Sequence, residues 1–150
     1  MQKIILSLLF SMMIGISNAQ LQEMETTGWS VVGHLKRLGT TIAKMEYKVS
    51  GTDTAYNLLM KDFKKQEETN YFSLGFRSTG NSFGRFYDLL KSFFLPENKS
   101  KDYMKTFRLG NESVNLQHIA IIGSKGVRLT TREGYINLSG KDIDKIFGMR

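Results

Sequence analysis

Polar and apolar side chains alternate along several segments of this chain, and this period of two constrains the fold more than any other feature. From Thr41 to Ser50, for example, Lys44, Glu46 and Lys48 are separated by apolar residues. Successive side chains of a strand leave opposite faces of a sheet, so the alternation predicts strands with one buried face and one exposed face. On this basis we predict strands at about residues 29–35, 41–50, 54–62, 70–77, 103–109, 116–122, 127–131 and 135–138.

Two segments show a helical spacing instead. Between Phe83 and Phe94 the apolar residues recur at steps of three and four, which predicts a helix with one apolar face that ends before Pro96. Near the carboxyl end, Ser139 followed three positions later by Asp142 approximates a capping box. We therefore predict helices at about residues 81–94 and 140–147.

The order of these elements is several strands, a helix, several strands and a helix. Short turns separate successive strands, for example at residues 37–41, 50–53 and 123–126, and such turns favour antiparallel hairpins. The sequence therefore predicts an α+β domain in which an antiparallel meander sheet of about six to eight strands carries both helices on one face. The two halves share no obvious sequence similarity, so no repeat is predicted.

The first 19 residues have the features of a secretory signal peptide. Lys3 provides a positive start, residues 4–16 form an apolar run, and Ser17 to Ala19 supply small residues suited to cleavage. An uncleaved membrane anchor is the alternative, but the run is shorter than the roughly 20 residues that a spanning helix needs. We predict a signal peptide at 1–19, a flexible arm at 20–28 and a single α+β domain at 29–150, secreted or periplasmic and without a membrane span after cleavage.

The chain contains no cysteine. This excludes disulfides, thiolate metal sites and a lipid-modified cysteine, and it favours a bacterial periplasm or exterior over an animal secretory pathway. The chain has 21 basic and 14 acidic residues, and loss of Lys3 with the signal peptide would leave a net charge of +6, which favours anionic partners. Glycosylation sequons at Asn98, Asn111 and Asn137 would matter only in a eukaryotic host.

The segment Gly80 to Gly84 matches G-x-S-x-G, the pattern that holds a nucleophilic serine on a turn between a strand and a helix. Ser82 has that context, and His118 follows it in the order found in hydrolases of this type, so a small serine hydrolase using both residues is the alternative function. The nucleophile turn belongs to a large parallel sheet, however, which hairpin-linked strands do not provide. Short polar residues also cap free amide groups at a helix start. We therefore predict that Ser82 and its neighbours cap the helix and that the protein is not an enzyme.

No residue spacing in the chain is typical of a metal or cofactor site. His34 and His118 are the only histidines, and alternation places His118 with the apolar side chains of its strand, which indicates packing. Neither an H-x-x-x-H pair nor an acidic calcium loop occurs, and residues 123–126 lack the spacing of a phosphate-binding loop. No metal and no cofactor are predicted.

Alternation also predicts where the basic side chains lie. If the apolar residues face the helices, a group of basic residues emerges on the opposite face of the sheet: Lys44, Lys48, Arg77, Arg128 and Arg132. Tyr71 is the only clear aromatic side chain on that face, which disfavours nucleic acid as the ligand. We therefore expect an exported, non-catalytic binding or structural module of the cell envelope or extracellular space, whose basic face contacts an anionic ligand or another envelope protein.

Overall fold

The computed structural model describes residues 28–64, 69–121 and 123–149. The predicted signal peptide at 1–19 and nearly all of the predicted arm at 20–28 lie outside these residues. The elements follow in this order: β1 (Ser30–Arg37), β2 (Thr40–Ser50), β3 (Asp53–Lys61), β4 (Tyr71–Arg77), the short 3-10 helix η1 (Thr79–Asn81), α1 (Ser82–Ser92), the 3-10 helix η2 (Pro96–Asn98), β5 (Met104–Leu109), β6 (Glu112–Ile121), β7 (Ser124–Thr130), β8 (Tyr135–Leu138) and α2 (Gly140–Ile146).

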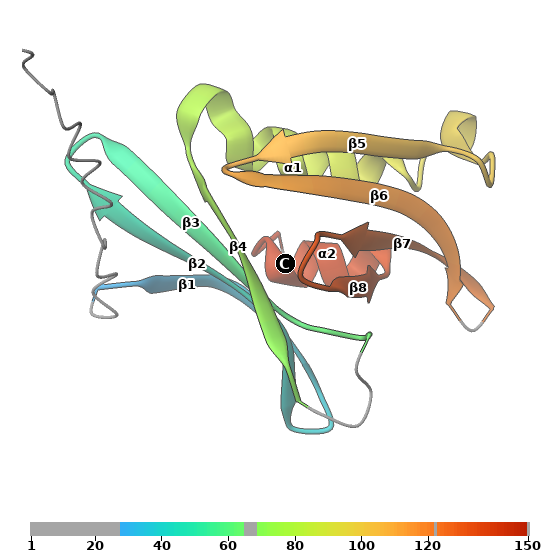
Figure 1. The fold of residues 1–150 in the computed structure, drawn as a ribbon, viewed down its shortest axis with the longest axis horizontal. Coiled ribbons are helices and arrows are strands. Elements are labelled where there is room, and N and C mark those ends of the chain that lie inside the picture. Colours follow the sequence, from blue (N-terminus) through green and yellow to red (C-terminus); the bar gives the residue numbers. More distant parts are fainter. Residues whose placement is uncertain (1–27, 65–68, 122, 150) are drawn as a thin grey trace, which may run out of the picture.

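The strands form two four-stranded antiparallel sheets (Figure 1). The strand order is β1-β2-β3-β4 in the first sheet and β5-β6-β7-β8 in the second, so each sheet is a meander. The α+β class, the antiparallel pairing and the two helices are as predicted, but the prediction of one continuous sheet is wrong. Alternation specifies the face that each side chain occupies and not the partner of each strand. Between β4 and β5 the chain passes through α1 instead of a hairpin turn, and there the strand pairing is interrupted.

The inner faces of both sheets and the apolar faces of both helices share one hydrophobic cluster. In β4, Phe72, Leu74 and Phe76 are buried while the residues between them are exposed, as alternation predicts. In Figure 1, α1 lies behind β5 and β6, and α2 lies behind β7 and β8. Phe147, which follows α2, joins the helices, because its ring centroid lies 5.0 Å from that of Phe83 in α1. The aromatic side chains of α1 therefore belong to the core.

Besides the shared hydrophobic cluster, close polar and backbone contacts hold the sheets against each other. At the turn between β5 and β6, Gly110 (φ 60°) lies so close to β4 that an added Cβ atom would overlap the carbonyl oxygen of Gly75. After β3, the buried carboxylate of Asp62 accepts hydrogen bonds from the amides of Tyr135 at 3.1 Å and Lys64 at 2.9 Å. The relative position of the sheets thus depends on a backbone approach that only glycine allows and on a buried acceptor.

Polar contacts cap the start of α2 and join this helix to α1. The Ser139 hydroxyl accepts a hydrogen bond from the Asp142 amide, and the Asp142 carboxylate accepts one from the Ser139 amide at 2.9 Å, so the predicted capping box is confirmed. In α2, Asp144 accepts hydrogen bonds from the Tyr87 hydroxyl at 2.9 Å and from the Lys91 ammonium group at 2.8 Å, both in α1. The two helices are therefore joined by an ion pair as well as by aromatic packing.

Each half of the described chain has the same order of elements, four antiparallel strands followed by one α-helix. The halves are interlocked, because α2 from the second half packs against β1 of the first. An added Cβ atom at Gly33 in β1 would overlap the carbonyl oxygen of Lys145 in α2. Glycine at this position therefore lets the helix approach the strand backbone closely.

Candidate functional site

A cleft of about 610 Å³ opens on the second sheet, at the end where β5 turns into β6 and β7 leads towards β8. Every side chain that lines it is polar or charged. The lining residues are Arg108, Asn111, Glu112, Ser113, Asn115, Thr130, Thr131 and Arg132. Two guanidinium groups and one carboxylate therefore share the cleft with amide and hydroxyl groups.

Strand pairing brings these side chains together. In β5, Arg108 lies between two residues that pack into the core, Phe107 and Leu109, and so faces outward. Register pairs Arg108 with Ser113 of β6, and it pairs Asn115 of β6 with Thr130 of β7. The cleft therefore depends on the pairing of three strands and is absent from any one hairpin alone.

The two arginines of the cleft differ in their partners. A guanidinium nitrogen of Arg132 lies 3.5 Å from a carboxylate oxygen of Glu112, and the Arg132 side chain is 79% exposed. Within the described residues, Arg108 is exposed and forms neither an ion pair nor a hydrogen bond through its side chain. The N–H donors of Arg108 are therefore available to a ligand, and those of Arg132 are only weakly engaged.

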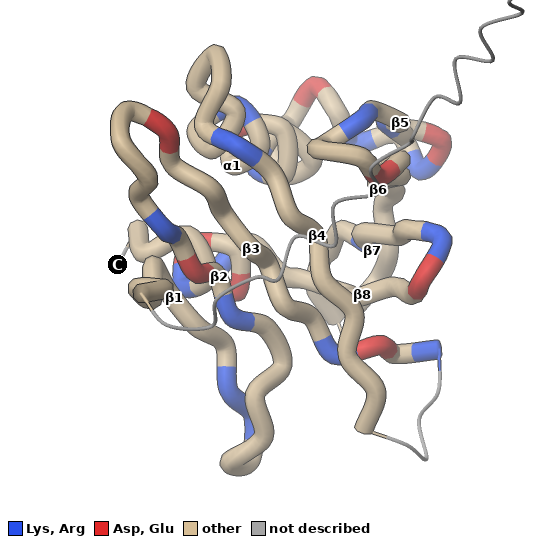
Figure 2. Tube along the Cα trace, turned by 60° about the vertical axis from the view of Figure 1, so that its left-hand side comes forward, with Lys and Arg blue, Asp and Glu red and all other residues tan. Residues whose placement is uncertain are grey.

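The structure divides the predicted basic residues between the two sheets. Lys44, Lys48 and Arg77 belong to the first sheet, where charges of both signs are interspersed (Figure 2). The Lys44 ammonium group lies 2.7 Å from the carboxylate of Glu46, and the Arg77 guanidinium lies 3.2 Å from that of Asp53. Lys48 also has an interaction partner. These three basic residues of the first sheet therefore already have partners.

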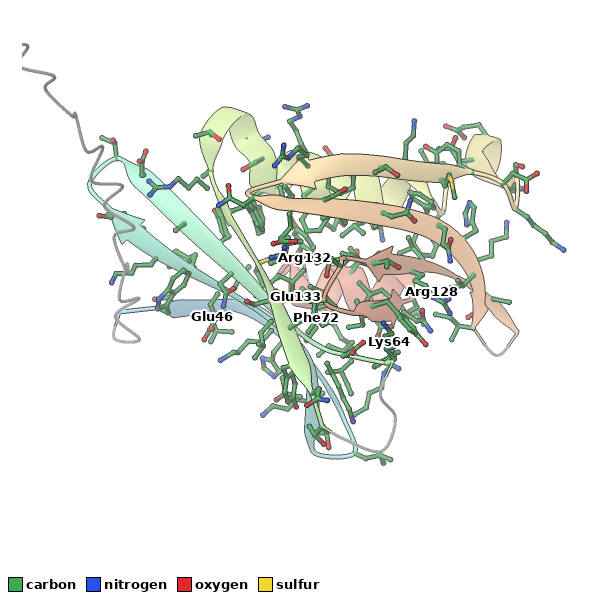
Figure 3. The ribbon with its side chains drawn as sticks, viewed as in Figure 1. Glu46, Lys64, Phe72, Arg128, Arg132 and Glu133 are labelled. Atoms are coloured by element: carbon green, nitrogen blue, oxygen red, sulfur yellow. The ribbon has the colours of Figure 1, made fainter. Side chains whose placement is uncertain are left out.

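The other two predicted residues, Arg128 and Arg132, belong to the second sheet and to the turn that follows β7. The Arg128 side chain donates a hydrogen bond to the Asn137 side chain at 3.0 Å and lies 4.4 Å from the centre of the Tyr135 ring. Figure 3 shows Arg128 apart from Arg132, which lies beside Glu133. One broad basic face is therefore not shown, because the five residues are divided between two sheets. Of the five predicted residues, only Arg132 lines the cleft.

Ser82 begins α1, as predicted, but its hydroxyl does not cap the helix. The residue at the N-cap position is Asn81, which is left-handed (φ 54°) and makes no side-chain capping hydrogen bond. The Ser82 hydroxyl instead donates to the carbonyl oxygen of Arg77 at the end of β4. Ser82 itself has ordinary helical backbone angles (φ −56°, ψ −32°), without the strain typical of a nucleophile turn. The side chain thus ties the strand end to the helix start.

The structure does not bring Ser82 and His118 together. A ring nitrogen of His118 lies 2.6 Å from the carbonyl oxygen of Asn98, and the ring packs 5.1 Å from that of Phe93, just after α1. Ser82 is at the opposite end of this helix of 11 residues, which is about 16 Å long. The distance separates the serine from its predicted base and leaves the hydrolase alternative without a catalytic pair.

Most residues of the cleft carry no signal in the sequence that predicts a site. The alternation that turns Arg108 outward is visible in the segment 103–109, where it lies between Phe107 and Leu109. The amide and hydroxyl side chains around it carry no comparable signal, because single polar residues on exposed strand positions occur in every sheet. Their convergence depends on register between separate strands.

The described part of the chain lacks two further kinds of functional element. No group of three or more histidine, aspartate or glutamate side chains there could hold a metal ion. No helix among residues 28–64, 69–121 and 123–149 is long and apolar enough to cross a membrane.

No known protein family, curated protein or solved structure matches this chain.

Proposed function

We propose that this protein is an exported, non-catalytic binding module that holds an anionic, hydroxyl-rich ligand in the cleft of the second sheet. The ligand class is a short acidic oligosaccharide or a similar sugar that carries carboxylate, sulfate or phosphate groups. Export is proposed from the sequence of residues 1–19, and the ligand class from the side chains of the cleft.

The observation that carries this proposal is the pairing of an unengaged arginine with a loosely engaged one. Arg108 has no side-chain partner among the described residues, and Arg132 makes one contact of 3.5 Å with Glu112 in the same cleft. Planar guanidinium groups bind carboxylate and phosphate oxygens through two parallel hydrogen bonds. A ligand oxyanion can therefore bind Arg108 directly and compete with Glu112 for Arg132.

The rest of the lining suits a sugar better than an apolar ligand. Asn111, Asn115, Ser113, Thr130 and Thr131 all carry groups that can both donate and accept hydrogen bonds, as sugar hydroxyls do. No aliphatic or aromatic side chain lines the cleft, whereas sites for apolar small molecules are built mainly from such residues. Hydrogen bonding and charge, rather than burial of apolar surface, would then supply the affinity.

Because the arginines are exposed, binding should be weak and sensitive to salt. Charges at a surface are screened over about 8 Å at physiological ionic strength. Ligand affinity should therefore fall when the salt concentration rises from about 50 to about 500 mM. A neutral oligosaccharide of the same length should show little binding at either concentration.

The experiment is a titration of the mature protein with an oligogalacturonate, monitored by the backbone amide signals in NMR spectra. The amides of residues 108–115 and 130–132 should shift. The double variant Arg108→Gln/Arg132→Gln should bind at least about tenfold more weakly, since two charge-assisted contacts are lost.

The control is Arg77→Gln/Arg85→Gln, which removes the same charge from exposed residues outside the cleft. It should bind within about twofold of the parent protein. Equal losses in the two double variants would show that net charge alone attracts the ligand. Unchanged binding in the cleft variant would rule the cleft out as the site.

A further inference from the structure

The tip of the first hairpin carries a leucine that nothing in the fold explains. Leu38 and Gly39 join β1 to β2, and both have positive φ angles, 48° and 80°. Two-residue turns of this kind favour Asn, Asp and Gly, because other side chains collide with their own backbone in this conformation. The Leu38 side chain is also fully exposed, at 105% of its reference accessible area. It therefore makes no compensating contact within the described residues.

Basic residues precede this leucine in the chain and lie at the same end of the sheet. Lys36 and Arg37 precede it in β1, and both are exposed. On the neighbouring strands, Lys61 of β3 pairs in register with Tyr71 of β4, and the Tyr71 hydroxyl donates to the carbonyl oxygen of Thr41 in β2. These contacts place Lys61 and Tyr71 at the same end of the first sheet as the hairpin.

The basic residues at this end of the sheet differ in their partners. Lys36 and Lys61 have no ion pair with any acid of the described residues. Arg37 is bound to Asp142 at 2.9 Å, which attaches the base of the hairpin to α2. The exposed tip thus carries one apolar side chain that directly follows two basic residues of β1, and Tyr71, which is 40% exposed, lies at the same end of the sheet.

We propose that this tip is a peripheral contact site for an anionic lipid bilayer. Leu38 enters the boundary between headgroups and acyl chains, Lys36 and Lys61 bind lipid phosphates, and Tyr71 lies at the level of the headgroups. Leucine gains by leaving water, basic residues are attracted to anionic leaflets, and tyrosine is enriched at membrane interfaces. One inserted side chain gives weak, reversible binding, as single anchors do.

A bilayer fits these residues better than a protein partner does. Protein contacts centre on anchors that are surrounded by other apolar or neutral residues, which exclude water. The two residues that precede Leu38 are both basic, and a lysine close to the inserted group suits a phosphate-rich surface. This inference is independent of the cleft, whose residues all lie on the second sheet or its turns.

The test is cosedimentation of the mature protein with vesicles of phosphatidylcholine that contain about 40% phosphatidylglycerol or none. The parent protein should bind only the anionic vesicles. Leu38→Asn should lower the partition coefficient about tenfold, because asparagine suits the turn but not the lipid. Lys36→Gln/Lys61→Gln should lower it by a similar factor.

The matched control is Val49→Asn, which replaces an exposed apolar residue at the end of β2 that lies far from the hairpin turn. Its partition coefficient should stay within about twofold of the parent value. A second measurement uses fluorescence: Leu38→Trp should be quenched by brominated lipids, and Val49→Trp should not.

The proposal is overturned if Leu38→Asn binds anionic vesicles as well as the parent protein does, or if the parent binds neutral vesicles equally. It is also overturned if the parent ignores vesicles but forms dimers that Leu38→Asn dissociates, since the tip would then be a protein contact. The variant Arg108→Gln/Arg132→Gln, which tests the cleft, should keep vesicle binding within about twofold, so the two proposals fail separately.

Discussion

Arg37 at the end of β1 donates a hydrogen bond to the carboxylate of Asp142 in the first turn of α2, at 2.9 Å, across 105 positions of sequence. The same carboxylate accepts hydrogen bonds from the amide and the hydroxyl of Ser139, at 2.9 and 2.8 Å. Asp142 is only 8% exposed. The buried Asp142 side chain therefore caps the N-terminus of α2 and also forms the ion pair that joins this helix to the first hairpin.

Removal of this acid should destabilise the protein substantially. Asp142→Ala loses the capping box and the bond to Arg37, and it leaves the Ser139 amide without its partner. We expect the free energy of unfolding to fall by about 2–3 kcal/mol, measured by urea denaturation. Arg37→Ala is the control: its side chain is 45% exposed, so only about 0.5 kcal/mol should be lost. Comparable losses in the two variants would mean that the ion pair, not the cap, dominates.

Glycine at position 110 should be required for the contact between the sheets. Gly110→Ala introduces a methyl group against the carbonyl oxygen of Gly75 and also strains a backbone with φ of 60°. The control, Gly51→Ala, has almost the same φ, 62°, and open space around it. Gly51→Ala should cost about 1 kcal/mol for the backbone alone, and Gly110→Ala at least about 2 kcal/mol more. Equal thermal shifts in the two variants would contradict the close approach of β4 to this turn.

The hairpin leucine should lower the stability of the folded protein. Leu38→Asn places a residue that tolerates positive φ in the turn, and no buried contact is lost because Leu38 is fully exposed. We expect the free energy of unfolding to rise by about 0.5–1 kcal/mol, read from the urea midpoint at constant slope. Val49→Asn, in a strand, should not raise it. A fall in stability on Leu38→Asn would show that the leucine has a structural role.

Glu112 should act as an internal competitor for the cleft ligand. Its carboxylate lies 3.5 Å from the Arg132 guanidinium, so Glu112→Gln removes a repulsive charge and frees the arginine. We expect oligogalacturonate to bind about threefold more tightly to this variant at low salt. Glu133→Gln changes the same net charge at an exposed residue that does not line the cleft, and should have a smaller effect. Equal gains would indicate a long-range field and no specific competition.

The local structure of this chain could largely be predicted from its sequence. Period-two alternation located Met45 inside and Lys44 outside, and the steps of three and four in α1 indicated a helix with a buried face. The capping box at Ser139 could be predicted from the spacing of Ser139 and Asp142, which are three positions apart. The site was harder to predict from the sequence. The outward direction of Arg108 followed from alternation, but nothing local related this residue to Arg132, which lies in a different hairpin.

The sequence by itself determined which residues form strands and helices and which face of each is buried, because these depend on side-chain period and short-range hydrogen bonds. Only the tertiary structure decided that the strands divide into two sheets, that Arg108 and Arg132 share a cleft, and that Ser82 and His118 lie apart. Those outcomes depend on strand partners and on close contacts such as Gly110 against Gly75, which arise between residues distant in sequence. The alternation of side chains within a strand does not depend on which strand pairs with it, so the sequence pattern does not specify the partner.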